Sequence, residues 1–214
     1  MKPSKSSERW RLIGFVGAFV LSGFAFIAIF PNIPHNHPTG YDQLMSAIDK
    51  KDVKTVESIL NNGFDPNTIP HEQADYTAED DISPLNSAAQ DGSTEIVKIL
   101  LDHGANPNLG DGWSYNPLSA ATQNENLKTM TLLIKRGAKV NDEFGNSYAL
   151  WRATMDGKVK STNFLLDHGA NPKSNLSGSL LDALKETHSK PEIIQIIENS
   201  LKSQAKQKWP NSRK

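Results

Sequence analysis

The chain has 214 residues, with 23 Lys and Arg against 24 Asp and Glu, and it contains no cysteine. This length suits one modest domain with a further segment. The missing cysteines exclude a fold held by disulfides, and they exclude attachment to a membrane through a lipidated cysteine.

The first segment is an apolar run from Leu12 to Phe30 that contains no charged residue. Its nineteen residues would span about 28 Å as a helix at about 1.5 Å per residue, close to the roughly 30 Å of bilayer hydrocarbon. A transmembrane anchor and a cleaved signal peptide both fit this pattern. Gly23 and Ala25 have the spacing of a cleavage site, but the apolar run continues beyond them, so we favour the anchor.

The basic residues of the N-terminus, residues 1–11, all precede this run, and none lies between Pro31 and Asp49. The positive-inside rule therefore predicts that residues 1–11 stay in the cytoplasm and that the chain after Phe30 lies on the opposite side of the membrane. Residues 31–40 follow as a linker, because three prolines in ten residues favour an extended, semi-rigid spacer. His35 and His37 have no third ligand nearby, which favours solvated histidines over a metal site.

One stretch of sequence recurs along the rest of the chain. Its clearest copy is Leu100–Asn108, and it returns at Ile59–Asn67, Leu132–Asn141 and Leu165–Pro172. The glycines of these copies, at positions 63, 104, 137 and 169, are separated by 41, 33 and 32 residues, which indicates a repeat array. Each copy predicts the end of a helix, because an apolar pair is followed by a glycine that can adopt the left-handed conformation.

A second element precedes three of these copies, at Ser83–Ala89, Asn116–Ala121 and Tyr148–Ala153. In the first two, a Ser or Asn cap followed by proline predicts the start of a helix. Together the two elements resemble the ankyrin repeat family, whose pattern runs T-P-L-H-x-A-A and later G-A-x-x-N. The resemblance covers residues 41–201. It implies an all-α solenoid of about five helix-turn-helix repeats with inter-repeat β-hairpin loops, behind the predicted transmembrane helix.

We expect repeats at Tyr41–Asn67, Ser83–Leu109, Asn116–Asp142 and Tyr148–Lys173, and a C-terminal cap at Ser179–Leu201 that lacks the glycine turn. Apolar residues at helical spacing predict the buried stripes. In the second repeat, the most regular, they are Leu85, Ala88, Ala89, Ile96, Val97, Ile99, Leu100 and Leu101; in the cap they are Leu180, Ala183, Ile193, Ile194, Ile196 and Ile197. Residues 202–214 form a basic tail, which we expect to be solvated and disordered.

An insertion interrupts the period between the first two repeats. The surplus lies in residues 69–81, which carry Glu72, Asp75, Glu79, Asp80 and Asp81 around one aromatic residue, Tyr76. Insertions of this kind fall in inter-repeat loops, often on the binding side, so this segment is either a partner-binding loop or a solvated loop. A calcium loop is disfavoured, because the acids lack the alternating order and the central glycine.

The resemblance implies that partners bind the hairpin tips and the exposed face of each first helix. Aromatic and charged residues at such positions are typical of interface hot spots. The predicted partner-binding residues are Tyr76, Glu79, Asp80, Asp81, Asp111, Trp113, Tyr115, Glu143, Phe144 and Arg152. Tyr148 and Trp151 occupy the family's Thr and His positions, where packing between repeats is favoured over binding.

Charge is distributed unevenly along the chain. Residues 31–201 carry fourteen Lys and Arg against twenty-three Asp and Glu, a net charge near −9, whereas the tail is near +5. An acidic array repels phosphate, so we expect no nucleic acid partner, and we expect a basic protein partner instead.

Catalytic motifs are missing from the sequence. There is no nucleophile elbow, no glycine-rich phosphate loop and no pair of histidines at metal spacing, so we expect no enzyme, no cofactor and no metal. His103 and His168, beside the turn glycines, should bond helix carbonyls.

These expectations combine into one hypothesis. We expect a monomeric, non-enzymatic interaction module, anchored by Leu12–Phe30 in a bacterial inner membrane with its repeats in the periplasm, the simplest location for an array outside the cytoplasm. It would be an immunity protein that neutralises a secreted toxin. A structural or assembly subunit of an envelope complex, or a support factor for a periplasmic enzyme, remains the alternative.

Overall fold

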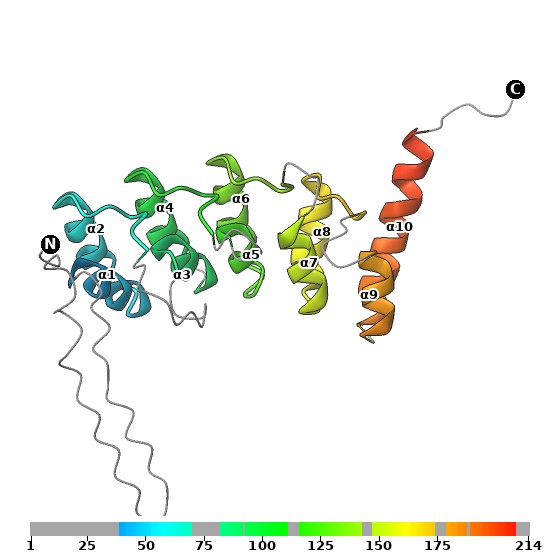
Figure 1. The fold of residues 1–214 in the computed structure, drawn as a ribbon, viewed down its shortest axis with the longest axis horizontal. Coiled ribbons are helices and arrows are strands. Elements are labelled where there is room, and N and C mark those ends of the chain that lie inside the picture. The colour runs from blue at the N-terminus through cyan, green and yellow to red at the C-terminus, as the bar shows by residue number, and fades with distance from the viewer. Residues whose placement is uncertain are drawn as a thin grey trace, which may run out of the picture. The chain divides into compact units, whose positions relative to one another are not determined.

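The computed structural model describes residues 39–69, 82–91, 93–110, 116–142, 147–173, 179–187 and 189–208. Within these ranges it contains ten helices and no β-strand. The helices are Thr39–Asp49 (α1), Val53–Asn61 (α2), Pro84–Gln90 (α3), Thr94–Asp102 (α4), Pro117–Ala121 (α5), Leu127–Lys135 (α6), Tyr148–Met155 (α7), Val159–Asp167 (α8), Leu180–Glu186 (α9) and Pro191–Lys208 (α10). They form consecutive pairs, which confirms the predicted helical solenoid of about five repeats (Figure 1). The tips of the expected β-hairpins lie outside the described ranges.

The chain divides into two compact units, Met1–His35 and Asn36–Lys214, and all ten helices of the described residues belong to the second unit. None of the helices in the described ranges is both long enough and apolar enough to cross a bilayer. The segment Leu12–Phe30 lies outside those ranges, so the membrane anchor stays a prediction.

Helices α3 and α5 begin where the sequence predicts, and their caps show why. Ser83 accepts a hydrogen bond from the amide of Asn86 at 3.2 Å, with Pro84 in the first turn of α3. At α5, Asn116 Oδ1 accepts from the amide of Ser119 at 2.9 Å, and Ser119 Oγ accepts from the amide of Asn116 at 3.0 Å. This reciprocal capping box satisfies amides that the first turn leaves without helical partners.

The turn glycines adopt the predicted left-handed conformation. Their φ angles are +90° at Gly63, +88° at Gly104, +95° at Gly137 and +87° at Gly169. A Cβ built at any of the four would meet nothing within 4 Å. The backbone angle, and not a lack of space, therefore selects glycine at these turns.

The repeats stack through their apolar faces. The first helices pack in the order α1, α3, α5, α7 and α9, and the second helices pack likewise from α2 to α8, with α10 against α8 and α9. Helices α3 and α5 pack against each other, and both bury alanines: Ala88 and Ala89 on α3, and Ala120 and Ala121 on α5. The predicted second-repeat stripe is buried except for Ile99, which is partly buried. In the cap, Leu184 is also buried, and the sequence analysis did not include it.

A ladder of asparagines joins each of the first three repeats to the next. Each asparagine donates its amide hydrogen to the carbonyl of the next turn glycine, and its Oδ1 accepts from the backbone amide two residues after that glycine. The bonds are Asn67 to Gly104 (3.0 Å) and Asn106 (2.7 Å), Asn108 to Gly137 (2.9 Å) and Lys139 (2.8 Å), and Asn141 to Gly169 (2.8 Å) and Asn171 (2.9 Å). The ladder ends at the fourth repeat, where Lys173 occupies the next such position.

Both outer boundaries of the array differ from the predictions. Helix α1 begins at Thr39, inside the segment assigned to the linker, and the Phe64 ring covers its first turn: a Cβ on Gly40 would lie 2.6 Å from Phe64 Cδ2. Helix α10 continues to Lys208, so the expectation of a disordered tail from residue 202 was wrong for residues 202–208. Lys, Gln and Ala dominate this extension, and all three favour helix.

Candidate partner-binding surface

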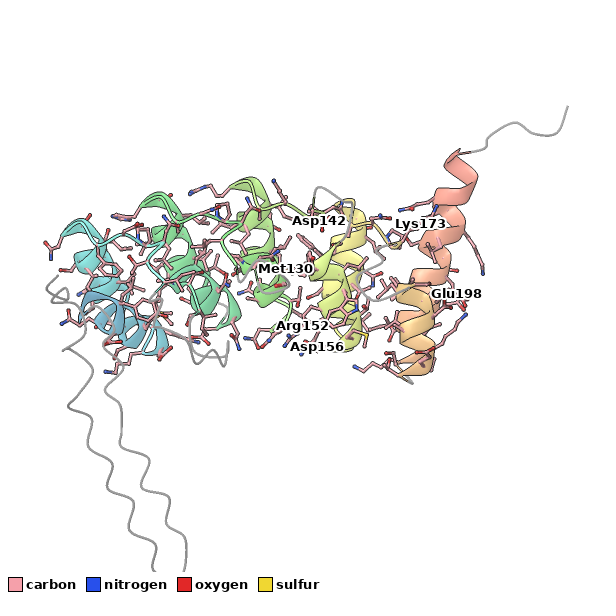
Figure 2. All side chains as sticks on the ribbon, in the orientation of Figure 1. Met130, Asp142, Arg152, Asp156, Lys173 and Glu198 are labelled. Atoms are coloured by element: carbon pink, nitrogen blue, oxygen red, sulfur yellow. The ribbon has the colours of Figure 1, made fainter. Side chains whose placement is uncertain are left out.

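Of the predicted partner-binding residues, Arg152 falls within the described ranges. It lies on α7, where its Nε donates to Asp156 Oδ2 at 2.6 Å, and the two side chains are 36% and 33% exposed. Figure 2 shows both at the lower edge of the repeat. An exposed pair four residues apart contributes only about 0.3–0.5 kcal/mol, so a partner can separate it at little cost. Tyr76, Glu79, Asp80, Asp81, Asp111, Trp113, Tyr115, Glu143 and Phe144 lie outside the described ranges.

The aromatic residues of α7 serve the fold. Trp151 is partly buried and packs against the hydrophobic core, as the sequence analysis favoured. Its buried Nε1 has no hydrogen-bond partner among the described residues, which costs on the order of 1–3 kcal/mol. Tyr148 is partly exposed at the start of the same helix. Burial of the indole nitrogen makes Trp151 a packing residue in this state of the array.

Carboxylates gather at the ends of the first helices. Asp49 is the last residue of α1, and Asp91 and Asp156 follow the last residues of α3 and α7. Burial raises the pKa of Asp91, and the negative charge of Asp49 raises it further. The negative end of each helix macrodipole also disfavours a carboxylate there. Asp49 and Asp91 form no ion pair within the described residues. The positive charge of Lys51 lowers the pKa of Asp91 in part, but the net shift is upward, so this edge keeps negative charge that Lys51 does not fully offset.

The sequence analysis did not select this row of carboxylates. Asp91 follows Ala88 and Ala89 closely, and Asp49 follows Ala47 in the same way. The sequence feature that could have identified these carboxylates is an acidic residue that follows the small residues of the first helix in more than one repeat. Each acid stands alone in its own repeat, and only the stacking of α1 on α3 brings Asp49 and Asp91 together.

Carboxylates on the second helices behave differently. Asp102 accepts from Lys98 Nζ at 2.6 Å and from Arg136 Nη1 at 2.7 Å, and Arg136 belongs to the next repeat. The hydrogen bond from Lys98, followed by that from Arg136, lowers the pKa of Asp102. This carboxylate is already paired, so its role is to join the second and third repeats.

The turn histidines are structural, in agreement with the sequence analysis. His103 Nδ1 lies 2.9 Å from the carbonyl of Ile99, and its Nε2 lies 3.1 Å from Asn61 Oδ1 in the preceding repeat. His168 repeats the first contact, with Nδ1 at 2.7 Å from the carbonyl of Phe164, and its ring stacks on that of Phe164 at 4.0 Å. In the part of the chain that the structure describes, no group of three or more His, Cys, Asp or Glu could hold a metal ion.

Comparison with known families agrees with this geometry. The family model described as ankyrin repeats (3 copies) matches residues 44–144 and 85–176, more than half of the chain. The chain belongs to the ankyrin repeat family. Its repeats therefore form a protein–protein interaction module, of a family that is generally non-enzymatic.

A curated relative supports the same assignment. An ankyrin repeat protein of Rickettsia bellii (strain RML369-C) is 30% identical over 90 residues, which cover 35% of this chain and 38% of the relative. The chain thus spans well under half of the length of that relative.

In an ankyrin array, the first helices lie on the partner-binding side. Polar residues follow the small residues of α3 and α5 here, and Gln90 Nε2 donates to Gln123 Oε1 at 3.2 Å across the two repeats. Asn124 also donates to the carbonyl of Gln90. The described part of this ankyrin surface is therefore polar and continuous, with Asp49 and Asp91 at one end and Arg152 at the other.

Proposed function

We propose that this ankyrin-repeat protein captures a basic protein partner on the surface formed by its first helices and the adjoining repeat tips. The observation that carries the proposal is the pair Asp49 and Asp91, which lie side by side without ion-pair partners among the described residues. Burial and the nearby charge of Asp49 raise the pKa of Asp91, and a cationic side chain from a partner would favour its charged form. The acidic balance of residues 31–201 supports the same choice of partner.

The location is part of the proposal. We place the array in the periplasm, anchored to the inner membrane by Leu12–Phe30, because the apolar run has the length of a membrane span and basic residues precede it. A tethered, acidic binding module suits an immunity protein that neutralises a basic toxin at the envelope. An assembly subunit of an envelope complex is the second candidate, favoured by the length of α10, which extends to Lys208.

Cross-linking in the envelope fraction tests the binding surface. In Asp49→Asn with Asp91→Asn, and in Trp113→Ala with Glu79, Asp80 and Asp81 reversed to Lys, we expect loss of the cross-linked partner. The control is Glu57→Gln with Glu192→Gln, which removes two exposed carboxylates from second helices. Unchanged partner recovery in both surface variants would refute the proposed surface.

The assembly alternative predicts the opposite pattern. Truncation within α10 would then remove the partner, whereas the first-helix variants would retain it. Under the main proposal the same truncation leaves the partner bound.

Protease accessibility tests the topology. We expect the repeats to be cleaved once the outer membrane is permeabilised while the inner membrane is intact. Protection until the inner membrane is broken would place the repeats in the cytoplasm and would overturn the proposed location.

A further inference from the structure

The edge that carries the turn glycines contains a second set of contacts between repeats. At the first joint, Asn61, two residues before its glycine, meets His103, the residue before the next glycine, at 3.1 Å. At the second joint, Asp102 and Arg136 occupy the same two positions and form an ion pair at 2.7 Å. Each of these joints pairs an oxygen-bearing side chain with a basic one.

The third joint breaks this pattern. Lys135 replaces the oxygen-bearing side chain, and His168 takes the position of the basic one. The His168 ring is held as His103 is, through Nδ1 and the carbonyl four residues earlier, at 2.7 Å and 2.9 Å respectively. No hydrogen bond joins Lys135 to His168 in this part of the structure. These two positions therefore hold basic residues and lack the carboxylate or amide oxygen that the other two joints have.

Further positive charge surrounds this joint. Lys139 in the same turn and Lys173 in the next are exposed, and among the described residues neither ammonium group lies within ion-pair distance of a carboxylate. Residues 126–141 contain no acid. The nearby carboxylates are Asp142, which Figure 2 shows on the same upper side as Lys173, and Asp167 on α8, at the position equivalent to Lys135. Figure 2 shows Lys173 on the upper side of the array, opposite Arg152 and Asp156. Lys135, Arg136, Lys139 and Lys173 are named here the basic edge.

Helix stability explains the presence of basic residues at only some positions of the basic edge. Lys135 and Arg136 lie at the end of α6, where basic residues favour the helix macrodipole. Lys139 and Lys173 lie beyond helix ends and gain nothing from it. Among the described residues their ammonium groups have no carboxylate partner, which marks a surface suited to an anionic group.

We propose that the basic edge binds an acidic segment of a protein partner, with a partner carboxylate at the third joint in the place that Asp102 has at the second. Asp102 demonstrates the chemistry, since it accepts from Lys98 at 2.6 Å and Arg136 at 2.7 Å on this same edge. The inference goes beyond the function proposed above: it concerns the opposite edge of the array and a partner of opposite charge. The two surfaces together would let one array hold a basic and an acidic protein.

Titration of the full chain in neutral detergent with fluorescein-labelled hexaglutamate, at low ionic strength, tests the proposal. We expect saturable binding, weakened by about two- to fivefold for each exposed lysine removed. The triple variant Lys135→Gln, Lys139→Gln and Lys173→Gln should then lose about tenfold or more. The matched control, Lys50→Gln, Lys54→Gln and Lys202→Gln, removes the same charge from exposed positions elsewhere and should retain the wild-type affinity.

A second variant separates binding from folding. Lys135→Asp restores an oxygen-bearing side chain to the third joint, so it should abolish hexaglutamate binding. The urea midpoint should change little, because the restored oxygen offsets the loss of a basic residue at the end of α6. Equal losses in the two triple variants would overturn the proposal, as would a lower midpoint in Lys135→Asp together with unchanged binding. Binding to phosphatidylserine vesicles without binding to hexaglutamate would also overturn it and would assign the edge to a membrane surface.

Discussion

Removal of one rung of the asparagine ladder should weaken the whole array. Asn108→Ala deletes the bonds to the Gly137 carbonyl at 2.9 Å and from the Lys139 amide at 2.8 Å. A net contribution of about 0.5–1.5 kcal/mol per bond gives about 1–3 kcal/mol for the pair. Both bonds are exposed, so water replaces part of them, and we expect a loss of about 1–2 kcal/mol. Asn108→Asp keeps the acceptor for Lys139 but loses the donor to Gly137, so it should rescue only part of this loss.

Urea denaturation followed by circular dichroism measures the change, and hydrogen exchange at the Lys139 amide localises it. With a slope of about 1–3 kcal/mol per molar urea, the midpoint should fall by roughly 0.3–2 M. Asn163→Ala is the control, because Asn163 is an exposed asparagine outside the ladder and its replacement should slightly favour α8. A midpoint equal to that of the wild type, with undiminished protection of the Lys139 amide, would show that the ladder bonds do not hold the repeats together.

Three further predictions concern single side chains. Gly40→Ala should destabilise the chain by about 1–3 kcal/mol in thermal denaturation, although alanine favours helix, because its Cβ would lie 2.6 Å from Phe64 Cδ2. The double variant Gly40→Ala with Phe64→Leu should recover part of this loss. A single variant more stable than the wild type would contradict the contact. Asp91→Asn should raise the urea midpoint at pH 7 and not at pH 3. A carboxyl whose folded-state pKa is raised above 3.8 disfavours folding as pH rises through that pKa. A gain of the same size at both pH values would contradict a raised pKa of Asp91 as the reason. Asp102→Asn should lower the midpoint at pH 7 and have a smaller effect at pH 3. The stability from a lowered pKa is fully present above 3.8 and is lost as pH falls from there through the folded-state pKa, so equal losses at both pH values would argue against the ion pairs with Lys98 and Arg136.

The repeat boundaries were predictable because their causes are local. Helix boundaries depend on features that act within a few residues: a left-handed glycine, a proline in the first turn and a Ser or Asn cap. Gly104 therefore predicts a helix end, and Ser83 predicts a helix start, without tertiary information. The two outer boundaries were not predictable in this way. The start of α1 depends on Phe64, which covers Gly40 from the end of the same repeat, and the extension of α10 follows helix propensity where no repeat motif marks an end.

The candidate site shows the limit of the same reasoning. The predicted site residues were chosen because acidic and aromatic residues cluster near them in the sequence. Of these predicted residues, Arg152 lies in the part of the chain that the structure describes. Sequence analysis did not select Asp49 and Asp91, which come together only when α1 stacks on α3. The asparagines of the G-A-x-x-N pattern were visible as well, but a turn motif does not reveal that Asn108 bonds to the next repeat.

The asparagine ladder also gives the array a mechanical direction. Every rung points forward from one repeat to the next, and the last rung reaches Asn171. Between the fourth and fifth repeats, the polar link that the described residues show is Lys190 Nζ to the Gly157 carbonyl at 3.0 Å. Under tension applied from the C-terminus, α9 and α10 should therefore detach as a unit at low force. The four repeats joined by the ladder should yield later, so unfolding under load would begin at the C-terminal end of the array.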